Sequence, residues 1–260
     1  MDTAVTTLAG LKNLPAFPPA AAKAMNLLAS ENVVYIEVAK TIQTDAALSA
    51  EVLRLANSAL FAARNRINTI PQALSFIGTR RLTGLLFTLC MSKLLKRIGA
   101  RESIRRCWYH NLACALAAKE FAKSFGRDVD EGYNAGLFHD IGRLALIMLE
   151  PARYDELIAQ EGALLELERA HFGIDHCEAG AWLIEQWKLP LAFVEVAMNH
   201  HSPKSEGSEV TMRVNGACAV ADRLGFSIRR APTDAAVDPN DELGLYITET
   251  IQALASEYGI

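Results

Sequence analysis

Apolar residues along most of the chain recur at the spacing of roughly three or four residues that is typical of an α-helix. The stretch TDAALSAEVLRLANSALF (residues 44–61) opens with Thr44 and Asp45, which are suited to capping a helix. One apolar stripe follows the helical repeat and is formed by Ala47, Leu48, Val52, Leu55 and Ala56. No sustained alternation of apolar and polar residues between turn residues predicts a β-strand. The pattern predicts an all-α protein.

Proline and glycine mark the expected ends of several helices. The prolines of FPPAAAKAMNLLASE (residues 17–31) suit a first helical turn, and Pro190 does the same for LAFVEVAMNHH. Gly78 predicts a stop between two helices, and Gly126 predicts the end of a long helix that begins near residue 103. Further helices are expected at residues 134–149, 151–161, 163–172, 176–189, 210–226 and after residue 241. SPKSEGSE and RRAPTDAAVDPND are loops by composition.

The charge balance divides the chain. Residues 1–106 carry 14 Lys/Arg and 6 Asp/Glu, whereas the remainder carries 12 and 24, within a net charge of −4. This split predicts two packed helical subdomains with different surfaces, at residues 1–100 and 101–260. The basic half either contacts phosphates or faces the acidic half. The second interpretation is favoured because no aromatic residues interleave the basic ones, so we do not expect a nucleic-acid partner.

The sequence predicts a soluble, cytoplasmic protein. No run reaches the roughly 18 apolar residues that a membrane span needs. The N-terminal MDTAVTTLAG lacks the basic cluster and long apolar stretch of a signal peptide. Five cysteines, at positions 90, 107, 114, 177 and 218, form no Cys-x-x-Cys pair and argue against a disulfide framework or a zinc ribbon. We interpret most of them as small buried apolar residues.

Histidines and carboxylates interrupt the apolar stretches of the second half of the sequence. The run NAGLFHDIGRLALIML (residues 134–149) carries His139 and Asp140 side by side in its middle. Several of the other candidates also lie where an unpaired polar group would be costly to bury. The candidate metal ligands are His110, His139, Asp140, His176, His200, His201 and Asp222.

These residue types suit a dinuclear metal site. Successive helical residues diverge by about 100°, so His139 can bind one ion while Asp140 bridges to a second. A nitrogen-rich set with a bridging carboxylate favours iron, manganese or zinc over magnesium or calcium. Two such ions activate a bridging water for phosphodiester hydrolysis. Taken singly, each residue has a structural alternative, such as a hydrogen-bonded core histidine or an Asp222 cap, and only the whole set favours metal.

The order of these residues resembles the HD superfamily of metal-dependent phosphohydrolases. The family signature is a His, a His-Asp pair and a distant Asp on helices, and His110, the HDIG of residues 139–142 and Asp222 follow that order. His176 and the pair His200-His201 are similar to the additional histidines of the dinuclear HD-GYP branch, which hydrolyses cyclic di-GMP. The resemblance implies two divalent ions of iron, manganese or zinc, with Asp140 and Arg143 as catalytic residues if the protein is an enzyme.

A narrower resemblance is to the HDOD domain, a divergent HD relative. It rests on LPAFPPAAAKAMNLL, AKTIQTDAALSAEVLRLANSALF, INTIPQALSFIGTRRLTGLLF and DHCEAGAWLIEQWKLPLAFVEVAMNHHSP. It spans about residues 10–225 and implies one module whose second half is an HD-like helical bundle. HDOD proteins are generally regarded as signalling or regulatory modules, and many lack the catalytic residues.

The sequence departs from the HD-GYP pattern at three places. HHSPKSEGSE stands where HHE and a Gly-Tyr-Pro loop are expected. Arg143 replaces the lysine that commonly follows HDIG, and Arg106 stands where some members place a glutamate ligand. The favoured expectation is therefore a signal-transduction module whose pocket holds metal or is vacant. The alternative is a metal-dependent phosphohydrolase acting on a nucleotide or cyclic dinucleotide.

The favoured expectation implies a signalling protein or a small anionic ligand as partner. The basic half of the chain is the expected place for this partner to bind. Its candidate residues are Arg80, Arg81, Arg97, Arg101 and Arg105.

Overall fold

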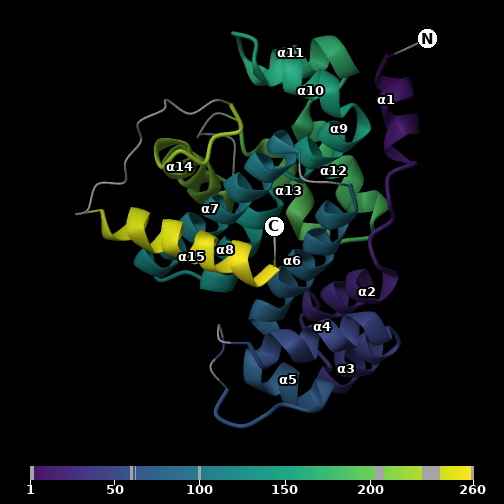
Figure 1. Cartoon of the computed structure of the whole chain (residues 1–260), viewed down its shortest axis with the longest axis vertical. Coiled ribbons are helices and arrows are strands. Elements are labelled where there is room, and N and C mark those ends of the chain that lie inside the picture. The colour runs from purple at the N-terminus through teal and green to yellow at the C-terminus, as the bar shows by residue number, and fades with distance from the viewer. Residues whose placement is uncertain are drawn as a thin grey trace.

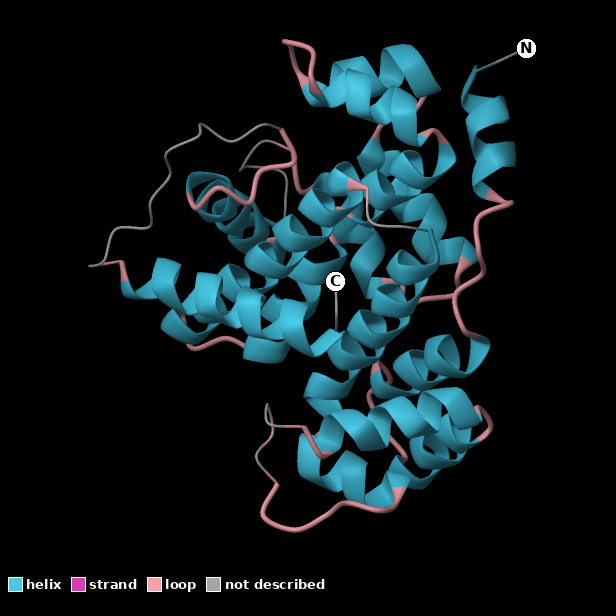
Figure 2. Cartoon of the chain, viewed as in Figure 1, coloured by secondary structure: helices cyan, strands magenta, loops and turns pink. Residues whose placement is uncertain are grey.

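The computed structural model describes residues 3–58, 61, 63–98, 101–202, 208–229 and 241–258, without the side chains of residues 97–98 and 256–258. Figure 2 shows these residues as helices joined by loops, with no strand among them. The all-α prediction is confirmed. The helices are α1 (Thr3–Leu11), α2 (Pro19–Leu28), α3 (Tyr35–Gln43), α4 (Ala46–Ala56), α5 (Ile70–Ile77), α6 (Thr79–Ile98), α7 (Glu102–Ser124), α8 (Val129–Phe138), α9 (Ile141–Leu149), α10 (Pro151–Ile158), α11 (Leu164–Phe172), α12 (His176–Gln186), α13 (Ala192–Asn199), α14 (Glu209–Arg223) and α15 (Glu242–Tyr258).

Local chemistry explains many of the helix ends. Asp45 caps α4 by accepting a hydrogen bond from the backbone N–H of Leu48 at 2.9 Å. Gly78 and Gly126 adopt φ angles of 87° and 64°, which disfavour most side chains, and they follow the ends of α5 and α7. Both predicted stops are confirmed. The loops predicted at residues 202–209 and 229–241 lie mostly outside the described residues.

The prediction of one helix over residues 134–149 is wrong. The chain forms α8 up to Phe138 and starts α9 at Ile141, with Asp140 at φ −106° and ψ 20° between them. Apolar side chains continue through the break because both sides of it are buried. The break turns the His139 and Asp140 side chains toward a common centre.

The long helix α7 organises the second half of the chain. It packs against α8, α14, α15 and α9, and Figure 1 shows α2–α5 at one end of the molecule and α10–α11 at the other. The first helix, α1, packs on α9 and α11, where the Thr7 hydroxyl donates a 2.8 Å hydrogen bond to the carbonyl of Phe172. Most buried apolar residues in the described part of the chain form one core, from Leu11 to Leu254, beside a small cluster of Ala135, Val196 and Val214. The boundary at residue 100 stays a prediction.

Among the described residues, arginines of the basic segment 1–106 pair with acidic residues that follow it. Arg80 lies 3.2 Å from Asp128, and Arg101 lies 3.3 Å from Asp155. Both pairs are exposed, so each contributes about 1 kcal/mol at most. Of the other predicted basic residues, Arg105 pairs with a neighbour on its own helix, and the side chain of Arg97 lies outside the described residues.

Among the residues that the structure describes, no helix combines the length and the apolar character needed to cross a membrane.

Candidate metal centre

Two glycines allow the backbone to place the His-Asp pair. A Cβ atom on Gly136 would lie 2.6 Å from the carbonyl oxygen of Cys114. Any residue other than glycine at this position would therefore prevent α8 from packing this closely against α7. A Cβ atom on Gly142 would lie 1.9 Å from the carbonyl oxygen of His176, at the contact of α9 with α12. These close approaches hold the α8–α9 break between the helices that supply the other polar side chains.

Asp140 lies at the centre of the site and is fully buried. Its Oδ1 atom is 3.1 Å from Nε2 of His200 and 3.3 Å from Nε2 of His176. Its Oδ2 atom is 3.4 Å from Nε2 of His139 and 3.6 Å from Nε2 of His110. The carboxylate therefore lies between two sets of imidazoles, one on each oxygen.

The potential ligand atoms fall into two groups. We call the first, on the Oδ1 side, the Asp–His group; it comprises Asp140, His176, His200 and His201. We call the second the Cys–His group; it comprises His110, Cys114, His139 and Cys218. Within each group the ligand atoms lie within 4.8 Å of one another. Six of the seven predicted ligands are thus brought together.

Asp222, the seventh predicted ligand, lies outside both groups. Its side chain is 54% exposed, and Oδ1 is 3.6 Å from Nδ1 of His110. That Nδ1 atom already lies 2.8 Å from the carbonyl oxygen of Phe226. Asp222 therefore faces the outer side of the His110 ring and not the Nε2 atom that faces Asp140.

Backbone carbonyls fix the orientation of three rings. Nδ1 of His139 lies 2.7 Å from the carbonyl of Gly136, and Nδ1 of His200 lies 2.9 Å from the carbonyl of Ala197. His110 makes the corresponding bond to Phe226. Because a carbonyl only accepts, each Nδ1 carries the proton that it donates, and Nε2 is directed to Asp140 or to the cysteines. This arrangement is common among metal-binding histidines.

The ring orientation at His200 places a nitrogen lone pair against the carboxylate of Asp140. Burial lowers the pKa of His200, so the ring is neutral and its one proton is on Nδ1. The bare Nε2 lone pair then faces Oδ1 of Asp140 at 3.1 Å. In addition, Oδ2 of Asp140 is buried with no hydrogen-bond partner among the described residues. The donor set and this unpartnered oxygen fit a divalent ion.

A buried acid that the sequence analysis missed supports His176. Glu168 is fully buried, and its Oε2 atom lies 2.5 Å from Nδ1 of His176 and 2.9 Å from the backbone nitrogen of the same residue. The hydroxyl of Tyr154 donates to the other oxygen of Glu168. Burial raises the pKa of Glu168, but His176 outweighs this effect and lowers it below the ordinary value of 4.5. The spacing of Leu164, Glu168 and Phe172 by four residues could have identified its inward face.

Arg143 provides a positive charge inside the Asp–His group. It is 6% exposed, and its Nε atom lies 3.1 Å from Oδ2 of Asp140. Its Nη2 atom lies 3.3 Å from Nε2 of His176 and 3.2 Å from Nε2 of His201. An arginine only donates, so the guanidinium uses the same lone pairs that would bind a metal ion. Burial raises the pKa of Asp140, but Arg143 and His139 together lower it well below 3.8.

Two cysteines that we had interpreted as apolar core residues contact the site. Cys114 and Cys218 lie with their sulfur atoms 3.6 Å apart. A hydrogen bond with Cys114 lowers the pKa of Cys218 well below 9.0. Burial lowers the pKa of His139, yet Cys218 and Asp140 raise it to about 10. The Cys–His group therefore stabilises positive charge at His139.

A cavity of about 240 Å³ opens over both groups. Its polar lining includes Asp140, Arg143, His201, Cys218 and Arg229. The Nε and Nη2 atoms of Arg229 are buried and have no partner in the described part of the chain. Two arginines, Arg143 and Arg229, therefore line this cavity.

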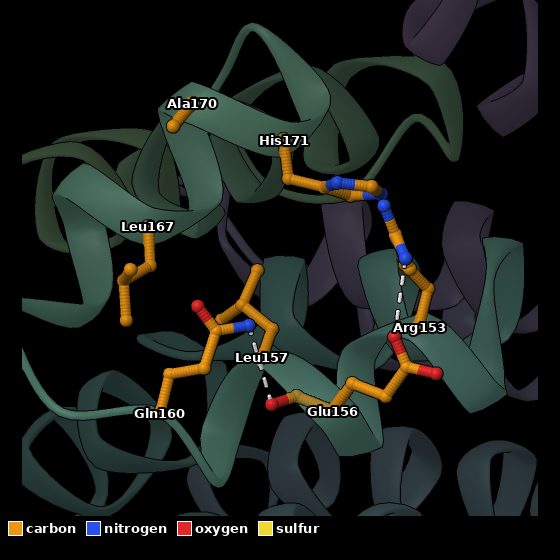
Figure 3. A pocket seen from close by; sticks show the side chains of 7 residues that line it. All are labelled: Arg153, Glu156, Leu157, Gln160, Leu167, Ala170 and His171. Atoms are coloured by element: carbon orange, nitrogen blue, oxygen red, sulfur yellow. Dashed lines mark hydrogen bonds and ion pairs between the residues drawn. The ribbon is translucent and has the colours of Figure 1, made fainter.

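A second cavity of about 260 Å³ lies between α10 and α11 and contains none of the predicted site residues (Figure 3). Arg153 pairs with Glu156 at 3.1 Å across its rim. His171, on the opposite helix, lies 3.6 Å from Glu150. Arg153, Glu156 and His171, the charged or ionisable residues that line this second cavity, each lie close to a partner.

Comparison with known proteins places the chain in a family. The HDOD domain family matches residues 14–203, and the chain belongs to it. A curated Treponema pallidum (strain Nichols) protein, itself described as uncharacterized, is 24% identical over 198 residues. That match covers 74% of this chain and 38% of the relative, so the chain spans well under half of the relative's length.

Solved structures share the fold. An HDOD domain protein of unknown function from Geobacter sulfurreducens aligns with a TM-score of 0.67 at 23% identity, over 98% of this chain and 96% of its own. A Shewanella amazonensis SB2B protein, provisionally named a phosphohydrolase, aligns with a TM-score of 0.69 at 24% identity, over 99% and 89%. A Marinobacter aquaeolei VT8 protein, provisionally named a signal transduction protein, gives 0.65 at 21% identity, over 95% and 58%. These likenesses establish the fold.

Proposed function

We propose that this protein is a non-catalytic signal-transduction module of the HDOD family. The observation that supports it is the position of Arg143, whose guanidinium lies among Asp140, His176 and His201. A dinuclear phosphodiesterase needs a second ion in the Asp–His group. Here the ring nitrogens that would bind this ion accept hydrogen bonds from a fixed cation instead.

The competition between Arg143 and a second metal ion is electrostatic as well as steric. Arg143 forms an ion pair with the buried carboxylate of Asp140; burial lowers the pKa of the guanidinium, but the charge of Asp140 outweighs this effect and raises it. A divalent ion entering the Asp–His group would meet this positive charge at contact distance in a medium of low dielectric constant. Arg143 thereby satisfies the charge of Asp140 without a metal ion.

The cavity fits a small phosphate-bearing ligand as the signal. Arg229 and Arg143 both line this cavity, and two buried guanidinium nitrogens of Arg229 have no hydrogen-bond partner among the described residues. Guanidinium groups bind phosphate oxygens through paired hydrogen bonds. Ligand binding is then read by a protein partner on the module surface, for which the exposed arginines of the basic half, such as Arg80, remain the proposed contact.

The test is a turnover assay under conditions that favour an enzyme. The protein is purified anaerobically without chelators, supplied with Fe²⁺, Mn²⁺ or Zn²⁺, and assayed with bis(4-nitrophenyl) phosphate and cyclic di-GMP. The expected result is no turnover above the Asp140→Asn variant. Turnover that depends on metal and is lost in Asp140→Asn would overturn the proposal. Calorimetric titration of cyclic di-GMP and inorganic phosphate into wild-type and Arg229→Ala protein tests the cavity separately.

A specific observation supports a second candidate, a metal-dependent phosphohydrolase. Oδ2 of Asp140 is buried without a hydrogen bond among the described residues, and Asp140 lies among five other predicted ligands. Two divalent ions would supply an activated water and charge neutralisation for phosphodiester hydrolysis. Asp140 would bridge them, His176, His200 and His201 would hold one, and Arg143 would have to withdraw toward the substrate phosphate. Two metal equivalents, absent in Asp140→Ala, together with turnover would favour this function.

A further inference from the structure

Three of the six distances between ligand atoms of the Cys–His group match those of a tetrahedral ligand set, and all six are within 4.8 Å. The two sulfur atoms, of Cys114 and Cys218, are 3.6 Å apart. Sγ of Cys114 lies 3.4 Å from Nε2 of His110, and Sγ of Cys218 lies 3.3 Å from Nε2 of His139. Zinc–sulfur bonds of about 2.3 Å and zinc–nitrogen bonds of about 2.0–2.1 Å, at the tetrahedral angle, place neighbouring ligand atoms about 3.3–3.8 Å apart. All three distances lie in this interval.

The ring orientations complete this set. Nδ1 of His110 lies 2.8 Å from the carbonyl of Phe226, and Nδ1 of His139 lies 2.7 Å from that of Gly136. Both rings therefore direct Nε2 toward the sulfur atoms. Such outer hydrogen bonds hold metal-binding histidines in the required tautomer.

The four side chains come from separate and rigid parts of the fold. His110 and Cys114 are one turn apart on α7, Cys218 is on α14, and His139 lies at the end of α8. These helices pack directly against one another. Three of the four residues are fully buried or nearly so, so the site is formed without movement of a surface loop.

We infer that His110, Cys114, His139 and Cys218 form a mononuclear site for a thiophilic divalent ion, of which Zn²⁺ fits best. Two thiolates and two imidazoles at tetrahedral spacing are typical of structural zinc sites. Cys218 takes the position next to His139, while Asp222, one turn further along α14, faces outward with its side chain 54% exposed. Oδ2 of Asp140, 3.4 Å from Nε2 of His139 and 3.1 Å from Nε of Arg143, lies beside the ligand set as a nearby negative charge.

This inference goes beyond the proposed signalling function. One ion in the Cys–His group leaves Arg143 in the Asp–His group and produces no dinuclear centre. The ion would link α7, α8 and α14 beneath the cavity. His110 and Cys114 lie on α7, Cys218 lies on α14, and His139 lies at the end of α8. Metal-dependent turnover in the assay above would overturn the signalling function but would not contradict a metal site in the Cys–His group. A bound ion without sulfur ligands would overturn this metal site but would not contradict the signalling function.

The test measures the metal and its ligands directly. Wild-type protein, loaded with one equivalent of Zn²⁺ after chelation, is studied by X-ray absorption, and the Co²⁺-substituted protein by visible and ultraviolet absorption. We expect sulfur neighbours in the first spectrum, and sulfur-to-cobalt charge transfer with the bands of tetrahedral cobalt in the second. We expect Cys218→Ser and Cys114→Ser to bind zinc at least about tenfold more weakly. Cys90→Ser, which changes a buried cysteine outside both groups, should match wild type.

Three outcomes would overturn the inference. One is a wild-type protein that binds no zinc or cobalt at one equivalent. The second is an absorption spectrum with nitrogen and oxygen neighbours only, a result that needs no variant and so does not depend on variant folding. The third is zinc affinity in the Cys114→Ser/Cys218→Ser protein equal to that of wild type, with circular dichroism showing that both are folded.

Discussion

The guanidinium Nε of Arg143 lies 3.1 Å from Oδ2 of Asp140, and both side chains are buried. They are three residues apart, on the first turn of α9 and at the residue that precedes it. In the folded protein the carboxylate therefore has a permanent counter-charge built into its own helix. The charge balance of the site depends on this pair, and two predictions follow from it.

Replacing Arg143 with methionine should destabilise the fold. The substitution keeps much of the apolar stem but leaves Asp140 as a buried charge without its main counter-charge. Breaking one side of a buried pair costs about 3–5 kcal/mol, and the remaining histidines favour the lower end. Urea denaturation of the metal-free protein measures the change. Arg153→Met, which breaks an exposed pair with Glu156, is the matched control and should change stability by less than about 1 kcal/mol.

The same substitution should create a metal site. Without the guanidinium, Nε2 of His176 and Nε2 of His201 are free to bind an ion beside Asp140. Manganese, which prefers oxygen and nitrogen ligands over thiolates, should occupy the Asp–His group and not the Cys–His group. We expect Arg143→Met to bind one more equivalent of Mn²⁺ than wild type, measured by elemental analysis after gel filtration. Equal manganese content in the two proteins would contradict the idea that Arg143 occupies the place of the second ion.

Local sequence signals identified most of the helices and six of the converging ligands, because helical spacing and the cost of buried polar groups are properties of short segments. The break at Asp140 was not predictable in this way. It depends on the contact of Gly136 with α7 and of Gly142 with α12, which only the folded chain brings together. Cys114 and Cys218 were missed for the same reason, since 104 residues separate them.

Gly142→Ala tests the backbone contact that forms the break. Its Cβ atom would overlap the carbonyl of His176 at 1.9 Å and the backbone nitrogen of Gly180 at 2.4 Å, and neither atom can move without shifting α12. We expect a loss of at least about 3 kcal/mol in unfolding free energy. Gly216→Ala is the control: its Cβ would lie 3.2 Å from the flexible Phe121 side chain, inside α14. Alanine has a higher helix propensity than glycine, and this gain should offset the cost of the contact in unfolding free energy. If the Gly142→Ala protein had the same unfolding free energy as wild type, the backbones of α9 and α12 could not approach each other as closely as these distances indicate.

The pair of Glu168 and His176 should make stability depend on pH in the acid range. The pKa of Glu168 is lowered in the folded protein, because His176 and Arg143 outweigh the effect of burial. A lowered folded pKa means that its contribution is complete above the unfolded value of 4.5 and is lost as pH falls through the folded value. Glu168→Gln removes the charge at every pH. We expect this variant to unfold at lower urea than wild type by about 2–3 kcal/mol at pH 7, and the gap to shrink toward pH 3.

The exposed Glu156→Gln variant provides the comparison for the acid-dependent effect. Its partner Arg153 is on the surface, so the gap to wild type should stay below about 1 kcal/mol at both pH values. A Glu168→Gln gap that is equally large at pH 7 and pH 3 would show that the variant loses packing and not the interaction of a charged carboxylate with His176. Because this interaction fixes the tautomer in which Nε2 of His176 faces Asp140 and Arg143, the same variant should also weaken Mn²⁺ binding when it is combined with Arg143→Met.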